Sequence, residues 1–525
     1  MPGASQTEEY IQANYGLGYA AFSLKKYAEA LSWFQKYVSQ MKDAATRTVA
    51  DSYNRIGDCQ FMQHAYWPAL DSYDKAWKYN LSTPDYACFQ KGFTYGLVDR
   101  QEQKVETLTT LLTSYPKSSY VDDALFEIGK AYVTLRKNEQ AINSFKKLIV
   151  NHPNSGYVSK ALLQLGLVYY NTDRNKEALE YYKKVVSDFP SSPDARNALT
   201  GIKNVYVGMN DADGYIAYAG SLGSMGNMSR SEQDSLTYKV AENMYLSNNC
   251  EGATTSLNNY LERFPQGNFR INAHFYLADC RLRDGNLEEA MKGFEYVIAQ
   301  PRNMFSEQAL MSASAIYFNQ GKFAESLASY QRLESEAEIK SNILDARIGI
   351  MRCQYRLKNY REAITAGLKV LDNKDLPAER IRETQFIVAQ SYRENKDLPN
   401  ALAEYRKVAK EVSSAEGAES KYHIIDILVQ QNKLKEAEDE VFDFAAKNTP
   451  HQYWFAKSFI LLSDIYVAKK DEFQAIHTLQ SVIGSYESQD DGIIELATNK
   501  KKALEDKANV VREVKVEDLE IEINH

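Results

Sequence analysis

A segment of about 37 residues recurs along this chain, and no other feature restricts its fold more. The stretch YPKSSYVDDALFEIGKAY, residues 115–132, is followed by HPNSGYVSKALLQLGLVYY, residues 152–170. The same proline, serine, tyrosine, alanine and glycine return in the same order, and Pro116 lies 37 residues before Pro153. Such self-similarity predicts a chain built from stacked copies of one supersecondary unit.

A small residue, most often alanine, marks the second half of each copy. It recurs at steps of 35 to 39 residues as Ala30, Ala69, Lys104, Ala141, Ala178, Tyr215, Ala253, Ala290, Ser326, Ala363, Ala401, Ala437 and Ala475. A bulky apolar residue follows four positions later in most copies, as Phe34, Tyr73, Phe145, Tyr182, Phe294, Tyr330 and Tyr405. The pattern predicts about thirteen copies that cover nearly the whole chain, residues 9–486.

Each copy is expected to form two amphipathic helices. In the fourth copy, one stripe consists of Ala124, Ile128, Tyr132 and Leu135, and a second of Ala141, Phe145, Leu148 and Ile149. Gly129 and Ala141 are small where we expect the two helices to cross closely, with Phe145 beside them. Proline is expected to stop the second helix at Pro116, Pro153, Pro190 and Pro265. Ser119, three residues before Asp122, is expected to cap the next helix.

The spacing from Gly129 to Pro153, 24 residues, resembles that of the tetratricopeptide repeat family, whose units are antiparallel helix pairs. The resemblance implies an all-α superhelical solenoid. The interval from Pro116 to Gly129, 13 residues, is about three longer than in a 34-residue repeat. This longer Pro-x-Ser-x-Tyr junction resembles that of bacterial envelope members of the family, of the BamD and YbgF–CpoB types.

The copies are uneven, and the sequence predicts two blocks. The expected divisions are an N-terminal block at 1–219, a Gly/Ser/Met-rich kink or linker at 220–232, a C-terminal block at 233–489, a capping helix at 490–513 and a tail at 514–525. The cap is predicted from an apolar stripe of Ile493, Ala497, Leu504, Ala508 and Val511. The tail is interpreted either as disordered or as a strand that pairs with a partner.

Charge and cysteine content exclude several classes of function. The net charge of −8 argues against a nucleic-acid surface, and no apolar run is long enough to span a membrane. The five cysteines are far apart and lack any CxxC pair, so all are expected to be unpaired and buried: Cys59, Cys88, Cys250, Cys280 and Cys353. The start, MPGASQTEEY, has neither a basic nor an apolar region typical of a secretory signal.

No pattern for catalysis or for a cofactor is found. The sequence lacks the phosphate loop GxxxxGK[ST], the nucleophile elbow GxSxG and the metal helix HExxH. The seven histidines fall in different copies or in the tail, and none has a second His or Cys three or four residues on. The chain is therefore predicted to be no enzyme and to hold no cofactor or metal.

The resemblance implies a concave groove. It would be lined by the residues three before, one after and four after the glycine position of each first helix. In the N-terminal block these positions give Tyr15, Tyr19, Phe22, Phe61, Phe89, Phe93, Phe126 and Tyr170 as partner-binding residues. In the C-terminal block they give Phe275, Phe318, Arg352 and Tyr355, with Arg356 beside them. Aromatic anchors of this kind suit apolar side chains of a bound segment. The lysine and asparagine clamp of chaperone-binding members is missing.

These observations predict a non-enzymatic scaffold whose partners are other proteins or peptides. The alternatives are an accessory subunit of bacterial envelope assembly or secretion machinery, and a regulatory module of a peptidoglycan or envelope enzyme. A place in a membrane-associated complex, in the periplasm or cell envelope of a Gram-negative bacterium, is expected, with the cytoplasm as the alternative location. The apolar first helix, residues 10–22, is further expected to follow repeats upstream of residue 1.

Overall fold

The computed structural model describes residues 7–41, 44–488 and 490–507, and every regular element in these ranges is a helix. The chain divides into two compact units, residues 1–244 and residues 245–525. The N-terminal unit contains α1 (Glu8–Ser23), α2 (Tyr27–Gln40), α3 (Arg47–Met62), α4 (Tyr66–Tyr79), α5 (Pro84–Leu97), α6 (Gln101–Ser114), α7 (Val121–Thr134), α8 (Asn138–Asn151), α9 (Val158–Tyr170), α10 (Asn175–Asp188), α11 (Pro193–Gly208), α12 (Ala212–Ser221) and the 3₁₀ turn η2 (Gly223–Met225). The division between the units falls within α13 (Arg230–Leu246).

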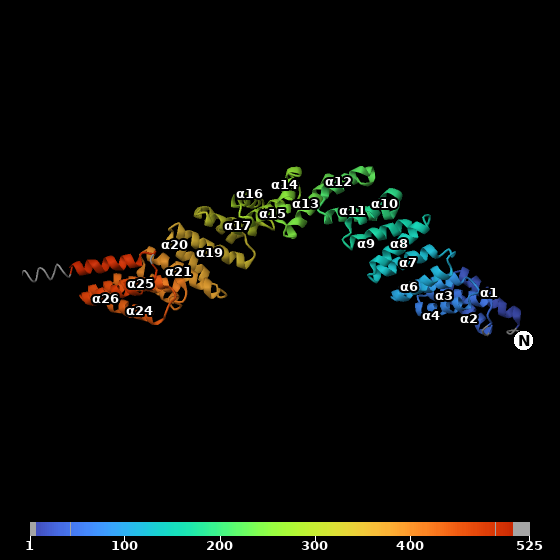
Figure 1. Cartoon of the computed structure of the whole chain (residues 1–525), viewed down its shortest axis with the longest axis horizontal. Coiled ribbons are helices and arrows are strands. Elements are labelled where there is room, and N and C mark those ends of the chain that lie inside the picture. The colour runs from blue at the N-terminus through green and yellow to red at the C-terminus, as the bar shows by residue number, and fades with distance from the viewer. Residues whose placement is uncertain (1–6, 42–43, 489, 508–525) are drawn as a thin grey trace, which may run out of the picture. The chain divides into compact units, whose positions relative to one another are not determined.

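The C-terminal unit continues the same alternation of helices. It contains α14 (Cys250–Arg263), α15 (Arg270–Arg283), α16 (Leu287–Ala299), α17 (Ser306–Asn319), α18 (Phe323–Glu336), α19 (Lys340–Arg356), α20 (Tyr360–Leu371), α21 (Ala378–Glu394), α22 (Leu398–Val408), α23 (Ala415–Gln430), α24 (Leu434–Ala446), α25 (Gln452–Ala468) and α26 (Glu472–Ser485). From α1 to α12 and from α14 to α26, helices that follow one another in the chain lie side by side (Figure 1).

Twelve consecutive pairs of helices pack together within one unit or the other, from α1 with α2 to α11 with α12 and from α15 with α16 to α25 with α26. In chain order, α13 and α14 stand where the remaining pair of the series belongs. The recurring small residue of each copy lies in the second helix of its pair, and all of these positions are buried, from Ala30 to Ala475. Even Lys104 and Tyr215, which replace alanine, are only 5% and 6% exposed. The predicted all-α solenoid of helix pairs is therefore confirmed.

Glycine lets the two helices of a pair approach closely. A Cβ atom built on Gly129 in α7 would lie 2.4 Å from Cε1 of Phe145 in α8, closer than carbon atoms can pack. Gly18 in α1 stands in the same relation to Phe34 in α2, at 2.7 Å. The ring four residues after the small residue thus fills the space that glycine leaves, as the sequence predicts.

Four second helices end where the sequence predicts, just before a proline. The helices α6, α8, α10 and α14 each end two residues before a proline, at Ser114, Asn151, Asp188 and Arg263. Proline lacks the N–H that the next helical hydrogen bond would need. The junction to the next pair begins at these points.

The predicted cap at Ser119 is wrong. Helix α7 begins after Tyr120, and no side chain caps it. The neighbouring Ser118 instead accepts a hydrogen bond from the Tyr120 N–H at 3.2 Å and donates one to Asp85 Oδ2 at 2.7 Å. Sequence spacing indicated a local cap, whereas the serine in fact ties its junction to the first helix of the preceding pair.

The next junction repeats this arrangement. Ser155 accepts from the Tyr157 N–H at 3.1 Å and donates to Asp122 Oδ2 at 2.6 Å. The Tyr157 hydroxyl also donates to Asp123 Oδ1 at 2.7 Å. This hydrogen bond and burial raise the pKa of Tyr157 to about 12. The Pro-x-Ser-x-Tyr junction is therefore a structural connection between successive first helices.

The prediction that all cysteines are unpaired is wrong for Cys250 and Cys280, which form a disulfide. They are 30 residues apart in sequence, but α14 and α15 pack together and bring their Cα atoms to 5.3 Å, a normal separation for a disulfide. The other cysteines are buried free thiols, as expected: Cys59, Cys88 and Cys353. The disulfide joins the second helix of one pair to the first helix of the next.

Residues 493–507 form a further helix after α26. Its Ile493 and Ala497 are buried in one cluster with Ile460 of α25 and Leu479 of α26. The expected continuation of this stripe at 508–513 and the tail at 514–525 lie outside the described residues. The packing gives the last pair a cover over its apolar side.

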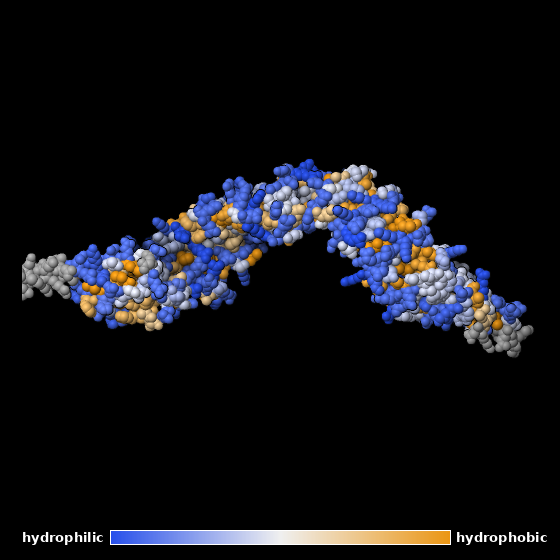
Figure 2. Space-filling model, viewed as in Figure 1, coloured by the Kyte–Doolittle hydropathy of each residue, from blue (hydrophilic) through white to orange (hydrophobic). Residues whose placement is uncertain are grey.

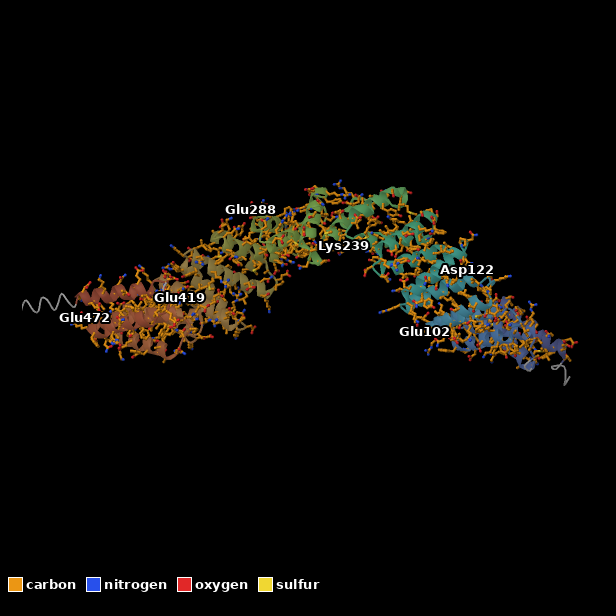
Figure 3. All side chains as sticks on the ribbon, in the orientation of Figure 1. Glu102, Asp122, Lys239, Glu288, Glu419 and Glu472 are labelled. Atoms are coloured by element: carbon orange, nitrogen blue, oxygen red, sulfur yellow. A yellow bond between two sulfur atoms is a disulfide. The ribbon has the colours of Figure 1, made fainter. Side chains whose placement is uncertain are left out.

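On the face that Figure 2 shows, both units are mainly polar. Hydrophilic residues dominate the visible face, with apolar residues showing between them near α8 and α10 (Figure 2). Figure 3 labels acidic residues that lie in the first turns of α6, α7, α16 and α26: Glu102, Asp122, Glu288 and Glu472. Negative charge at these positions favours the helix because it faces the positive end of the helix dipole.

Candidate functional site

The first helices of the N-terminal unit carry a linked set of tyrosines and charges. Tyr15 and Tyr19 are half-buried on α1, and both hydroxyls donate hydrogen bonds to Asp51 Oδ2 of α3, that of Tyr15 at 2.8 Å. Burial and the contact with Asp51 raise the pKa of Tyr19 to about 12 and also raise the pKa of Tyr15. Both predicted residues therefore lie together, with their hydroxyls held by a carboxylate.

Arg55 of α3 lies between two rings. Its guanidinium carbon is 5.6 Å from the ring centroid of Phe22 and 5.3 Å from that of Tyr86 in α5. It also forms a 2.7 Å ion pair with Asp58, which accepts a hydrogen bond from Tyr86 at 2.6 Å. Burial raises the pKa of Asp58, and Arg55 opposes that shift. Phe22 thus contacts a cation held in place by its neighbours.

Two of the predicted groove residues are largely buried between repeats. Phe89 is 9% exposed and stacks on Tyr120 at 5.1 Å between centroids. Phe126 is 8% exposed and stacks on Tyr157 at 4.8 Å. Each ring therefore contacts the junction tyrosine of the following repeat, and little of its surface is left for a partner.

The remaining predicted residues of this unit are half-buried. Phe61 and Phe93 approach each other at 6.2 Å between centroids, and Phe93 continues to Phe89 at 6.1 Å. Tyr170, at the end of α9, packs against the core of the unit. The structure thus joins Phe61, Phe93 and Phe89 in one aromatic run, with Tyr170 apart from these contacts.

In the C-terminal unit, first helices of four successive pairs line one cleft of ≈ 530 Å³. The lining residues come from α17, α19, α21 and α23: Phe318, Arg352, Tyr355, Arg356, Glu383, Phe386, Ile387, Gln390 and Glu416. The predicted Phe318, Arg352 and Tyr355 are therefore brought together. Burial raises the pKa of the Tyr355 hydroxyl above its ordinary value.

The cleft presents charge as well as aromatic surface. Arg352 Nε donates to Glu383 Oε1 at 2.6 Å, and Arg380 donates to the other oxygen of the same carboxylate at 3.3 Å. The exposed Arg356 stands 5.7 Å from the ring centroid of Phe323 and forms no ion pair with any residue that the structure describes. A cleft of this composition suits a segment with an apolar side chain and a carboxylate.

Phe275, the remaining predicted residue, lies outside this cleft. It is 3% exposed and stacks on Phe305, the residue before α17, at 4.5 Å between centroids. Phe275 lies three residues before Ala278, which stands where other repeats have glycine. Phe89 and Phe126 occupy the same position in their own repeats. Stacking onto the next junction is thus common to both units.

The sequence interpretation missed several residues of these surfaces. Asp51 lies six residues before Gly57, and Tyr86 lies six residues before Gly92. Both are about one helical turn before the first predicted groove position, which is three residues before the glycine. This spacing could have identified both. Phe386 lies 15 residues before Ala401, the same spacing that Phe275 has before Ala290, so counting back from the recurring alanine could have identified it.

No group of three or more His, Cys, Asp or Glu residues that could hold a metal ion occurs in residues 7–41, 44–488 and 490–507. None of the helices described for this chain is both long and apolar enough to cross a bilayer.

Family models of the tetratricopeptide repeat match the chain in both units. One matches residues 123–155 and 160–192, and another matches residues 8–46 and 389–453. No curated protein sequence matches the chain at a significant level.

Several solved protein structures are similar to the chain over part or most of its length. MamA is 22% identical and covers 32% of this chain and 94% of its own, with a TM-score of 0.28. A tetratricopeptide repeat protein from Parabacteroides merdae ATCC 43184 is 15% identical and covers 51% of this chain and 100% of its own, with a TM-score of 0.31. The structure of Naa15/Naa10 bound to HypK is 10% identical and covers 94% of this chain and 79% of its own, with a TM-score of 0.38.

Proposed function

We propose, from the premise that this chain is a tetratricopeptide repeat protein, that it is a non-enzymatic scaffold which binds segments of partner proteins. The observation that carries the proposal is the cleft of the C-terminal unit. Phe318, Tyr355 and Phe386 supply rings from three successive repeats, and Arg356 adds a charge without an ion-pair partner among the described residues. Aromatic and arginine side chains dominate the binding energy of protein interfaces.

Crosslinking from within the cleft tests this function. A photoreactive benzoylphenylalanine in place of Phe318 is expected to capture a partner protein in cells. The matched control carries the same group in place of Phe442, which is 50% exposed on α24 outside the cleft. Adducts of equal identity and yield from both positions, or adducts from position 442 alone, would contradict the proposed site.

We further propose that the scaffold is an accessory subunit of envelope assembly or secretion machinery in the periplasm or cell envelope. The disulfide between Cys250 and Cys280 supports an oxidising compartment, because structural disulfides are rare in the reducing cytosol. The resemblance of the Pro-x-Ser-x-Tyr junction to envelope repeat proteins points the same way. Partners in that location would belong to membrane-associated complexes.

Thiol trapping in fractionated cells tests the location. The protein is denatured without reductant and treated with a maleimide that adds mass to each free thiol. Three modified thiols in the periplasmic fraction are expected, at Cys59, Cys88 and Cys353. Five modified thiols in a cytosolic pool would overturn this second proposal and leave the first intact.

A further inference from the structure

One face of α1 is apolar and uncovered by any segment that the structure describes. Ala13, Leu17 and Ala20 are exposed, Leu17 to 46%. A Cβ atom built on Gly16, between them, would meet nothing within 4 Å. Leu24, at the end of the same stripe, is 68% exposed. Spacings of three, four and seven residues place these side chains on one side of the helix.

The same positions are buried in the first helices of later pairs. These positions lie five residues before, one residue before and two residues after the glycine of the helix. In α3 they are Ser52, Ile56 and Cys59, and in α7 they are Ala124, Ile128 and Ala131. Each of these residues is no more than 4% exposed. Ile56 and Cys59 share a cluster with Ala30 and Phe34 of α2, the preceding helix. This face is thus the one on which each repeat receives another helix, and α1 presents it without a described partner.

The charges at the two ends of α1 indicate what can cover the face. Glu8 and Glu9 are exposed in its first turn, and Lys25 and Lys26 are exposed just beyond its last turn. Lys26 has only a weak contact with Glu29, at 3.6 Å. Glu9 precedes Leu17 by eight residues, and Lys25 follows it by eight. A second copy of α1 laid antiparallel across Leu17 would therefore place acid beside base at both ends.

We propose that the chain forms a twofold dimer in which the α1 helices of two copies pack antiparallel, with the axis near Leu17. A twofold interface uses the same patch on both copies and must be self-complementary, which this arrangement of charges and small residues satisfies. Glycine and alanine near the axis let the two backbones approach closely. The contact extends over the ~24 Å length of a 16-residue helix.

The mass in solution tests the proposal directly. Light scattering after gel filtration of the full chain is expected to give twice 59.8 kDa, and Leu17→Glu is expected to give the monomer mass. The control is Leu368→Glu, because Leu368 on α20 is equally exposed, at 46%. It should remain dimeric. A monomeric wild-type chain, or a dimer that Leu17→Glu leaves unchanged, overturns the proposal.

Charge reversal tests the antiparallel arrangement. The double variant Lys25→Glu/Lys26→Glu brings four acids together at each end, and its dimer dissociation constant is expected to rise at least about tenfold at low salt. Adding Glu8→Lys and Glu9→Lys restores complementary charges and should restore the dimer. Failure of this rescue, with helicity unchanged by circular dichroism, excludes the proposed packing.

Discussion

The ring of Phe126 in α7 stacks on the ring of Tyr157 at the start of the next repeat, with 4.8 Å between the centroids. The same contact joins Phe89 to Tyr120 and Phe275 to Phe305. In each case the first residue stands on a first helix and the second immediately before the next one. These rings lie between repeats, where removing one leaves a cavity.

Phe126→Ala is therefore expected to lower the free energy of unfolding by about 3–5 kcal/mol, the range for deleting a buried aromatic side chain. Phe318→Ala is the matched comparison, because the ring of Phe318 is half-buried at the cleft. This variant should lower the free energy of unfolding clearly less than Phe126→Ala does. Urea denaturation followed by circular dichroism measures both. Equal losses would show that Phe318 also belongs to the core.

Ala141 lies at the crossing of α7 and α8 and is 0% exposed. Ala141→Arg is expected to destabilise the chain by at least about 1–3 kcal/mol, because it overpacks the crossing and buries a charge. Asn143→Arg places the same side chain at an exposed position of α8 and should change stability little. A thermal melt that ranks the two variants in the opposite order would contradict the assigned helix crossing.

The disulfide closes a loop of 30 residues. Replacing both cysteines by serine, or reducing the bond, is expected to cost about 2–4 kcal/mol in the C-terminal unit. Reductant should lower the melting temperature of the wild-type chain. It should have no further effect on Cys250→Ser/Cys280→Ser, since the remaining cysteines are already thiols.

Burial lowers the pKa of His274 to about 4 and also lowers the pKa of His423, which Arg393 contacts. The unfolded state, with a histidine pKa of about 6.5, then binds protons before the folded state does, so stability falls as the pH drops below about 6.5. Urea midpoints from pH 7.5 to 5 should decline less steeply for His274→Gln/His423→Gln. His477→Gln, at an exposed position, should keep the wild-type slope.

Arg356→Ala should weaken a partner captured at the cleft by about 1–2 kcal/mol, because it removes a cation that no described residue neutralises. Lys358→Ala removes an exposed charge two residues away, outside the cleft, and should leave the affinity unchanged. Calorimetric titration with the partner segment measures both. Similar losses from the two variants would indicate a general effect of charge.

Periodicity predicted the helix pairs because each repeat buries its small residue against immediate neighbours. Ala141 and Ala178 are both fully buried in the core of the N-terminal unit, so a local pattern is sufficient to place them. The pairing of Cys250 with Cys280 was missed, since it depends on contact between helices of successive pairs and not on a short motif. For the same reason, Ser118 was overlooked in favour of Ser119.

The candidate site was predictable only by position. Spacing from a glycine placed Phe89 and Phe126 on first helices, and the equivalent position in a later repeat, where alanine replaces the glycine, placed Phe275. It could not reveal that their rings stack on an aromatic residue 30 or 31 positions later. Phe318, Arg352 and Tyr355 occupy comparable positions, and there the packing leaves a cleft. Whether such a ring is buried or open is decided by the next junction.

The ion pair between Lys104 and Glu127 restricts how this array can be rearranged. Lys104 occupies the slot held by alanine in most repeats, and its partner lies on α7 in the following repeat, with side chains 7% and 10% exposed. Moving either repeat elsewhere would strand a buried charge, which is strongly destabilising. Duplication or exchange of single repeats is therefore disfavoured at this point, and the third and fourth repeats are expected to be inherited as one block.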